Sequence, residues 1–110
     1  MTPTTTSTPA RFTRFADFYP FYLGEHRHPA CRTLHFIGTS IGAALLVTAL
    51  VTGNGWLVPL GIVQGYAWAW VGHFGFEKNK PASFKQPLYS FMGDWVMWAQ
   101  LLTGRIPFKP

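Results

Sequence analysis

The sequence predicts an all-α membrane protein, built as a hairpin of two transmembrane helices with an amphipathic interfacial helix on either side. Three observations lead to this fold class. The chain has 110 residues, of which 48% are apolar and only 12% charged, whereas soluble domains carry about 25% charged residues. Every Asp, Glu, Lys and Arg lies before residue 33 or after residue 76, so 44 consecutive residues have no formal charge. The turn signal Gly53-Asn54-Gly55 divides this uncharged block into two apolar segments.

The first predicted element is an amphipathic helix at about residues 11–23. Its aromatic side chains recur at helical spacing. They are Phe12, Phe15, Phe18, Tyr19 and Tyr22. Residues 1–10 are rich in Thr, Pro and Ser and lack an apolar stretch, which predicts a disordered tail and not a signal peptide. Residues 11–110 are then expected to form a single membrane domain.

The two central elements are the predicted transmembrane helices, at about residues 33–52 and 56–75. Each segment has 20 residues, and a helix of that length is about 30 Å long, the thickness of the hydrocarbon core of a bilayer. Pro59 falls in the first turn of the second segment, where a missing N–H costs little. The alternative is a buried hairpin in a soluble bundle. The roughly 60 remaining residues are too few to coat two helices that are apolar on all sides.

The last predicted element is a second amphipathic helix at about residues 88–104. Its apolar residues at helical spacing are Leu88, Phe91, Met92, Trp95, Val96, Ala99 and Leu102. Both flanking helices are expected either to lie in the cytoplasmic membrane interface or to pack against the hairpin.

The charge distribution predicts the topology and the class of partner. Basic residues flank the hairpin at both outer ends and are absent from its turn, so both termini are expected on the cytoplasmic side, of the inner membrane if the chain is bacterial. Membrane lipid is therefore the expected partner, and nucleic acid is not, because the charges bracket an uncharged block. Each span contains a Gly-x-x-x-Gly motif, at 38–42 and 61–65, which allows close helix contact within the hairpin or in a homo-oligomer.

The hairpin is expected to bring histidines together at its open end. In an antiparallel pair centred on Asn54, the numbers of facing residues add to about 108, which pairs His35 with His73. His26 and His28 precede the first span at the same edge. The sequence therefore predicts a cluster of imidazoles where the hairpin meets the cytoplasm.

An acidic residue and a cysteine lie close to these histidines in the sequence. Glu77 follows His73 by four residues, one turn along a continuing helix. Imidazole and carboxylate ligands suit iron, manganese or zinc, and we rank iron first because zinc would favour cysteine. Cys31, the only cysteine, has no partner for a disulfide or a C-x-x-C pair and is interpreted as a bystander.

Two stretches resemble the signature segments of a known membrane family. They are FYPFYLGEHRHPACRTLHFIG at residues 18–38 and WVGHFGFEKNKPA at residues 70–82. The specific motif is V-G-H-x-x-F-E-K-x-x-P-A, and H-x-x-P-x(5)-H is a weaker one. The family includes the fungal iron(II)-dependent 2-hydroxy-fatty-acid dioxygenase of the endoplasmic reticulum and many small bacterial relatives. The resemblance covers about residues 12–108.

The resemblance implies a metal site and a reaction. Carried over by position, the metal-binding histidines are His26, His35 and His73, and the matching acid is Glu77, either a direct ligand or the acceptor that orients His73. His28 stands where the family commonly has Asn, so no ligand role is implied for it. The implied reaction uses Fe(2+) and O2 to shorten a 2-hydroxy fatty acid by one carbon.

The substrate carries over less directly than the metal. Arg32 and Lys78 lie near enough in the sequence to steer a substrate carboxylate, or else they contact lipid headgroups. The fungal enzyme is longer between the two motifs, so this chain has fewer helices from which to build an acyl groove.

Two other functions fit the same residues. His35 and His73 could be the axial ligands of a b-type haem held between the helices. The chain could also be a non-enzymatic membrane protein that binds no metal.

Overall fold

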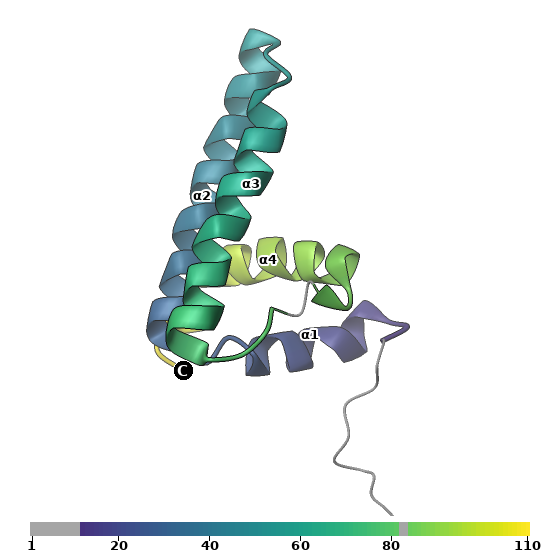
Figure 1. The fold of residues 1–110 in the computed structure, drawn as a ribbon, viewed down its shortest axis with the longest axis vertical. Coiled ribbons are helices and arrows are strands. Elements are labelled where there is room, and N and C mark those ends of the chain that lie inside the picture. Colours follow the sequence, from purple (N-terminus) through teal and green to yellow (C-terminus); the bar gives the residue numbers. More distant parts are fainter. Residues whose placement is uncertain (1–11, 82–83) are drawn as a thin grey trace, which may run out of the picture.

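The computed structural model of the chain describes residues 12–81 and 84–110, and these residues form helices and no strand. The elements are α1 (Phe15–Gly24), α2 (Pro29–Thr52), α3 (Leu57–Val71), the π-helical segment η2 (Gly72–Glu77) and α4 (Pro87–Leu102). The predicted all-α class is thus confirmed. Figure 1 shows α2 and α3 as a long antiparallel hairpin, with α1 and α4 extending sideways from its lower half. The expected tail, residues 1–10, lies outside the described residues.

The first arm of the hairpin, α2, begins one turn earlier than the sequence predicts. The side chain of His28 accepts a hydrogen bond of 3.1 Å from the backbone N–H of Ala30, and Pro29 occupies the first turn, as is common at helix starts. The helix ends at Gly53, whose φ of 74° is the left-handed conformation that glycine adopts freely. With 24 residues, α2 is about 36 Å long. Among the described residues it is the one helix long and apolar enough to cross a membrane.

The second arm is divided into two helical types. α3 has only 15 α-helical residues and continues as six π-helical residues in η2. The predicted span at 56–75 therefore corresponds to a shorter α-helix, and its crossing of a membrane stays a prediction.

The Gly-x-x-x-Gly motifs of the two arms face each other inside the hairpin. A Cβ on Gly38 would lie 2.9 Å from Cβ of Trp68 and 3.2 Å from the carbonyl oxygen of Gly65. Gly42 faces Gly61 less closely, and a Cβ on Gly42 would lie 3.7 Å from the Gly61 carbonyl oxygen. The facing numbers add to 103 and not to 108, because the close glycine crossing sets the register more strongly than the turn does.

The two outer helices pack against each other. Phe18 and Tyr22 of α1 and Met97 and Leu101 of α4 form a buried cluster. Gly93 of α4 lets the Tyr22 ring approach to 3.0 Å from the position a Cβ would take. The buried face of α4 is thus a row of small and apolar residues, while Leu88 and Leu102, on the face expected from the sequence, remain 68% and 59% exposed.

Candidate metal centre

Three imidazoles from three elements meet at the base of the hairpin. His26 lies between α1 and α2, His35 in α2 and His73 in η2, and all three are buried. Nε2 of His26 is 2.9 Å from Nε2 of His35 and 3.0 Å from Nε2 of His73. His35 and His73 lie together as expected, and His26 joins them.

The other nitrogen of each imidazole faces a carbonyl oxygen. The distances from Nδ1 are 2.6 Å for His26 to the Tyr22 carbonyl, 2.9 Å for His35 to the Cys31 carbonyl, and 2.7 Å for His73 to Oδ1 of Asn79. The amide of Asn79 is oriented because its Nδ2 donates to the carbonyl of Glu25. A carbonyl oxygen can only accept a hydrogen bond, so each Nδ1 carries the hydrogen.

This tautomer leaves three Nε2 lone pairs facing one another. Neutral imidazole has one donor and one acceptor nitrogen, and two acceptors cannot bond to each other. Burial lowers the pKa of His26 well below its usual value, and the neighbouring His35 and His73 lower it further. A cation bound between the three converging lone pairs would relieve their repulsion.

The donor set fits a transition-metal ion. Two imidazole nitrogens bound at about 2.0–2.1 Å to one ion lie roughly 2.9–3.4 Å apart for octahedral to tetrahedral angles, and two Nε2 pairs lie at 2.9 and 3.0 Å. His26, Cys31, His35 and His73 form a group that could hold a metal, with their ligand atoms within 4.8 Å of one another. The Cys31 sulfur lies 3.7 Å from Nδ1 of His35, beside the nitrogen that already faces a carbonyl.

Helix direction explains why His35 and His73 meet. Side chains on a helix lean toward its N-terminus, and the two arms of the hairpin run in opposite directions. His35 therefore leans toward the base and His73 toward the tip, and their ring centroids are 5.1 Å apart. Gly72 allows this approach, since a Cβ there would lie 2.9 Å from the sulfur of Cys31.

The end of η2 places Asn79 against His73. Lys78 has a φ of 61°, the left-handed conformation, which reverses the chain. The backbone N–H of Asn79 then donates to the carbonyl of His73, and its side chain returns to the imidazole. The role of Asn79 cannot be predicted from the sequence, because its position depends on this one backbone conformation.

Glu77 and His28 lie beside the group and hold the start of α2. The carboxylate of Glu77 accepts a hydrogen bond from the backbone N–H of His28, and the His28 side chain caps the helix. Nδ1 of His73 faces Oδ1 of Asn79. Asn79 therefore has the orienting role that was one of the two expected for Glu77.

Arg32 and Lys78, the expected carboxylate-steering residues, have different surroundings. Arg32 is buried, and it donates from Nε to the carbonyl of His26 and from Nη1 to the carbonyl of Pro107, both at 2.7 Å. It therefore ties the His26 loop to the C-terminal segment. Lys78 is exposed at the surface.

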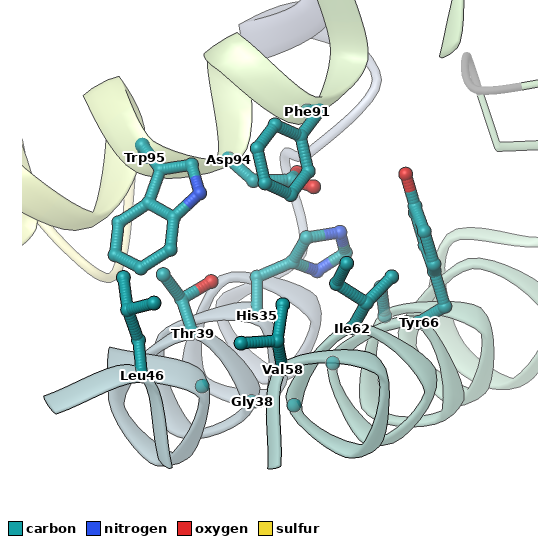
Figure 2. Close-up of a pocket in the computed structure, with 14 residues that line it drawn as sticks. His35, Gly38, Thr39, Leu46, Val58, Ile62, Tyr66, Phe91, Asp94 and Trp95 are labelled. Atoms are coloured by element: carbon teal, nitrogen blue, oxygen red, sulfur yellow. The ribbon is translucent and has the colours of Figure 1, made fainter. Parts of the chain in front are cut away.

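An apolar groove adjoins the histidines. It has a volume of about 130 Å³ and lies between the hairpin and α4, with His35 and Asp94 among the residues that line it (Figure 2). A small second cavity is lined by all three histidines and also by Tyr22, Tyr66, Ser90 and Asp94. Because His35, Tyr66 and Asp94 line both, the groove adjoins the candidate metal centre.

Asp94 is an acidic residue beside the histidines that was not among the site residues expected from the sequence. Burial raises its pKa to about 7, and the hydrogen bond that it accepts from the Tyr22 hydroxyl opposes this shift. The available signal was its position as the one acid in the apolar segment 88–104.

Comparison with known proteins identifies one related family. A family model described as 2-hydroxy-palmitic acid dioxygenase Mpo1-like matches residues 12–106, which include every residue of the candidate centre. No match is found among curated proteins or among solved structures.

Replacing any one of His26, His35 and His73 by Ala is expected to abolish metal retention, since each removes one of three converging nitrogens. Elemental analysis of protein purified gently in detergent measures the metal content. His28→Asn is the matched control and should retain the metal. Loss of metal in His28→Asn with retention in His26→Ala would mean that the wrong histidine has been assigned.

Asn79→Leu is expected to weaken metal affinity roughly 10- to 100-fold, because it removes the acceptor that fixes the tautomer of His73. Competition with a metal-buffering chelator measures the affinity. Glu77→Gln is the control, since an amide oxygen can still accept the His28 N–H, and its affinity should stay within a few-fold of the original. The opposite ranking of the two variants would assign the orienting role to Glu77.

Proposed function

The chain belongs to the Mpo1-like family, and on this basis we propose that it is an iron(II)-dependent dioxygenase that removes one carbon from 2-hydroxy fatty acids at a membrane surface. The observation that carries the proposal is the convergence of three buried Nε2 lone pairs, each fixed by a carbonyl behind its ring. His26, His35 and His73 are the proposed ligands. Imidazole ligands suit iron(II), which would supply the reactivity with O2 when bound.

The proposed reaction balances without an external reductant. A 2-hydroxy acid and O2 give the acid one carbon shorter, CO2 and water. The bond between carbons 1 and 2 breaks, and the four electrons that reduce O2 come from these two carbons. Iron(II) would supply the reaction with O2, and the protein would hold the carboxyl end of the substrate beside the histidines and exclude water.

The apolar groove is proposed as the binding site of the acyl chain. Its floor is the glycine crossing of the hairpin, and its far end is lined by Leu46 and Val58. His35 and Leu46 are 11 residues apart on α2, which corresponds to about 16 Å along the helix. The small residues of the hairpin and the ring of Trp95 on α4 thus line a groove for the acyl chain (Figure 2). The groove forms although the short turn between the two spans leaves no room for further helices.

The hairpin is proposed to lie in a bilayer with its base at the cytoplasmic interface. Leu50, Val51 and Trp56, at its tip, are 77%, 80% and 82% exposed. Apolar surface of this extent indicates contact with lipid or another protein, and the absence of charge between residues 33 and 76 favours lipid. α1 and α4 extend sideways from the base, where interfacial helices would lie (Figure 1).

A reporter enzyme fused to either terminus is expected to show cytoplasmic activity, because basic residues flank the hairpin at both outer ends. The same reporter inserted between Gly53 and Gly55 should be active on the opposite side of the membrane. Cytoplasmic activity from the inserted reporter would contradict the topology.

The arrangement favours a non-haem site over a b-type haem. Nε2 of His26 lies within 3.0 Å of Nε2 of both His35 and His73. A haem with these two axial ligands would need its porphyrin ring in the space that the third imidazole occupies. The position of His26 thus favours a non-haem metal site over a haem bound by His35 and His73.

Protein loaded with iron(II) under argon is expected, on addition of O2, to convert 2-hydroxypalmitate to pentadecanoic acid with one CO2 released per O2 consumed. Mass spectrometry and an oxygen electrode measure this stoichiometry. A chelator and His35→Ala should each abolish turnover. An intense Soret band in the purified protein would support the haem alternative, and iron-loaded protein that consumes no O2 with this substrate would contradict the proposed reaction.

A further inference from the structure

One face of α4 presents two polar side chains to the histidine cavity. Ser90 and Asp94 are four residues apart, one helical turn, and both line the small cavity that the three imidazoles share. The rest of the buried face of α4 is Gly93, Met97 and Leu101, which pack in the apolar region against α1. The two polar groups therefore lie at the end of this face that borders the histidine cavity.

Ser90 has a buried hydroxyl without such a partner. The residue is 3% exposed, and its Oγ makes no hydrogen bond with the described residues. A buried hydroxyl left unpaired is destabilising, so its presence in a cavity beside candidate metal ligands indicates that a bound molecule supplies the partner.

Asp94 stands at the junction of the two cavities. Its carboxyl group accepts a hydrogen bond from the hydroxyl of Tyr22, whose ring stacks on His26 with centroids 4.0 Å apart. The Tyr22 bond engages Oδ1, and Asp94 lines both the groove and the histidine cavity. A molecule whose tail lies in the groove and whose head reaches the histidine cavity would pass this carboxyl group, because Asp94 lines both. Figure 2 shows Asp94 facing the groove beside His35.

We propose that Ser90 and Asp94 recognise the 2-hydroxyl group of the substrate, Ser90 by donating to its oxygen and Asp94 by accepting its hydrogen. This inference rests on the proposed function and adds the selectivity for a hydroxylated over a plain fatty acid. A donor and an acceptor one turn apart match the two roles of an alcohol. A plain fatty acid offers only hydrogen atoms there and would leave the Ser90 hydroxyl unpaired, while Asp94 would keep its bond from Tyr22 and gain no second one. A polar group left unpaired is the situation in which polar sites discriminate most strongly.

The test is a comparison of binding, measured under argon so that no turnover occurs. Tryptophan fluorescence follows the binding of 2-hydroxypalmitate and of palmitate to the metal-loaded protein in detergent, because Trp95 lines the groove. Ser90→Ala is expected to reduce the preference for the hydroxylated acid roughly 10-fold, to leave palmitate affinity and metal content unchanged, and not to lower the thermal midpoint, since its hydroxyl has no internal partner. Asp94→Asn should reduce the preference while the amide oxygen still accepts from Tyr22.

Ser40→Ala is the matched control. Ser40 lies on α2 and accepts a hydrogen bond from Nε1 of Trp98, outside both cavities, so this variant should keep the preference. An unchanged preference in Ser90→Ala and Asp94→Asn, or an equal fall in both affinities with loss of metal, would overturn the inference and leave the proposed function standing. Failure of the unaltered protein to bind either acid would instead overturn the proposed function.

Discussion

The candidate metal centre depends on the fixed orientation of three buried imidazoles whose Nε2 atoms converge. Each ring is oriented from behind by a carbonyl oxygen on a different segment: the end of α1, the first turn of α2, and the residue that follows the reversal after η2. None of the rings can turn away without leaving a buried N–H unpaired. The histidine arrangement is therefore built into the backbone of three elements, which is how proteins preorganise metal ligands.

The candidate centre also requires the helices to approach one another closely, and glycines allow this at several separate contacts. Gly38 and Gly65 set the hairpin crossing, Gly72 lets η2 approach Cys31, and Gly93 admits the ring of Tyr22. Each contact places one of the elements that carry the histidines or their supports. Larger side chains at these positions would move the elements apart, and imidazole nitrogens that must lie about 3 Å apart tolerate little displacement.

The sequence predicts the elements well and their contacts only in part. Charge distribution and helical spacing indicate the hairpin and both flanking helices, and the hairpin itself brings His35 toward His73. The role of Asn79 depends on the left-handed backbone conformation of Lys78. Lysine rarely adopts this conformation, and no local sequence pattern predicts it here. The buried face of α4 escapes prediction for another reason: its small residues give a weaker periodic signal than the large apolar residues of the exposed face.

The groove along the hairpin has a kinetic consequence for the proposed reaction. Its walls include Leu46 and Ile62, which are 40% and 44% exposed, so it borders the surface that would contact lipid. A fatty acid would then enter sideways from the bilayer and not from water. The quantity that governs the rate would be the mole fraction of substrate among the membrane lipids, and inert lipid added at constant total substrate would slow turnover by two-dimensional dilution.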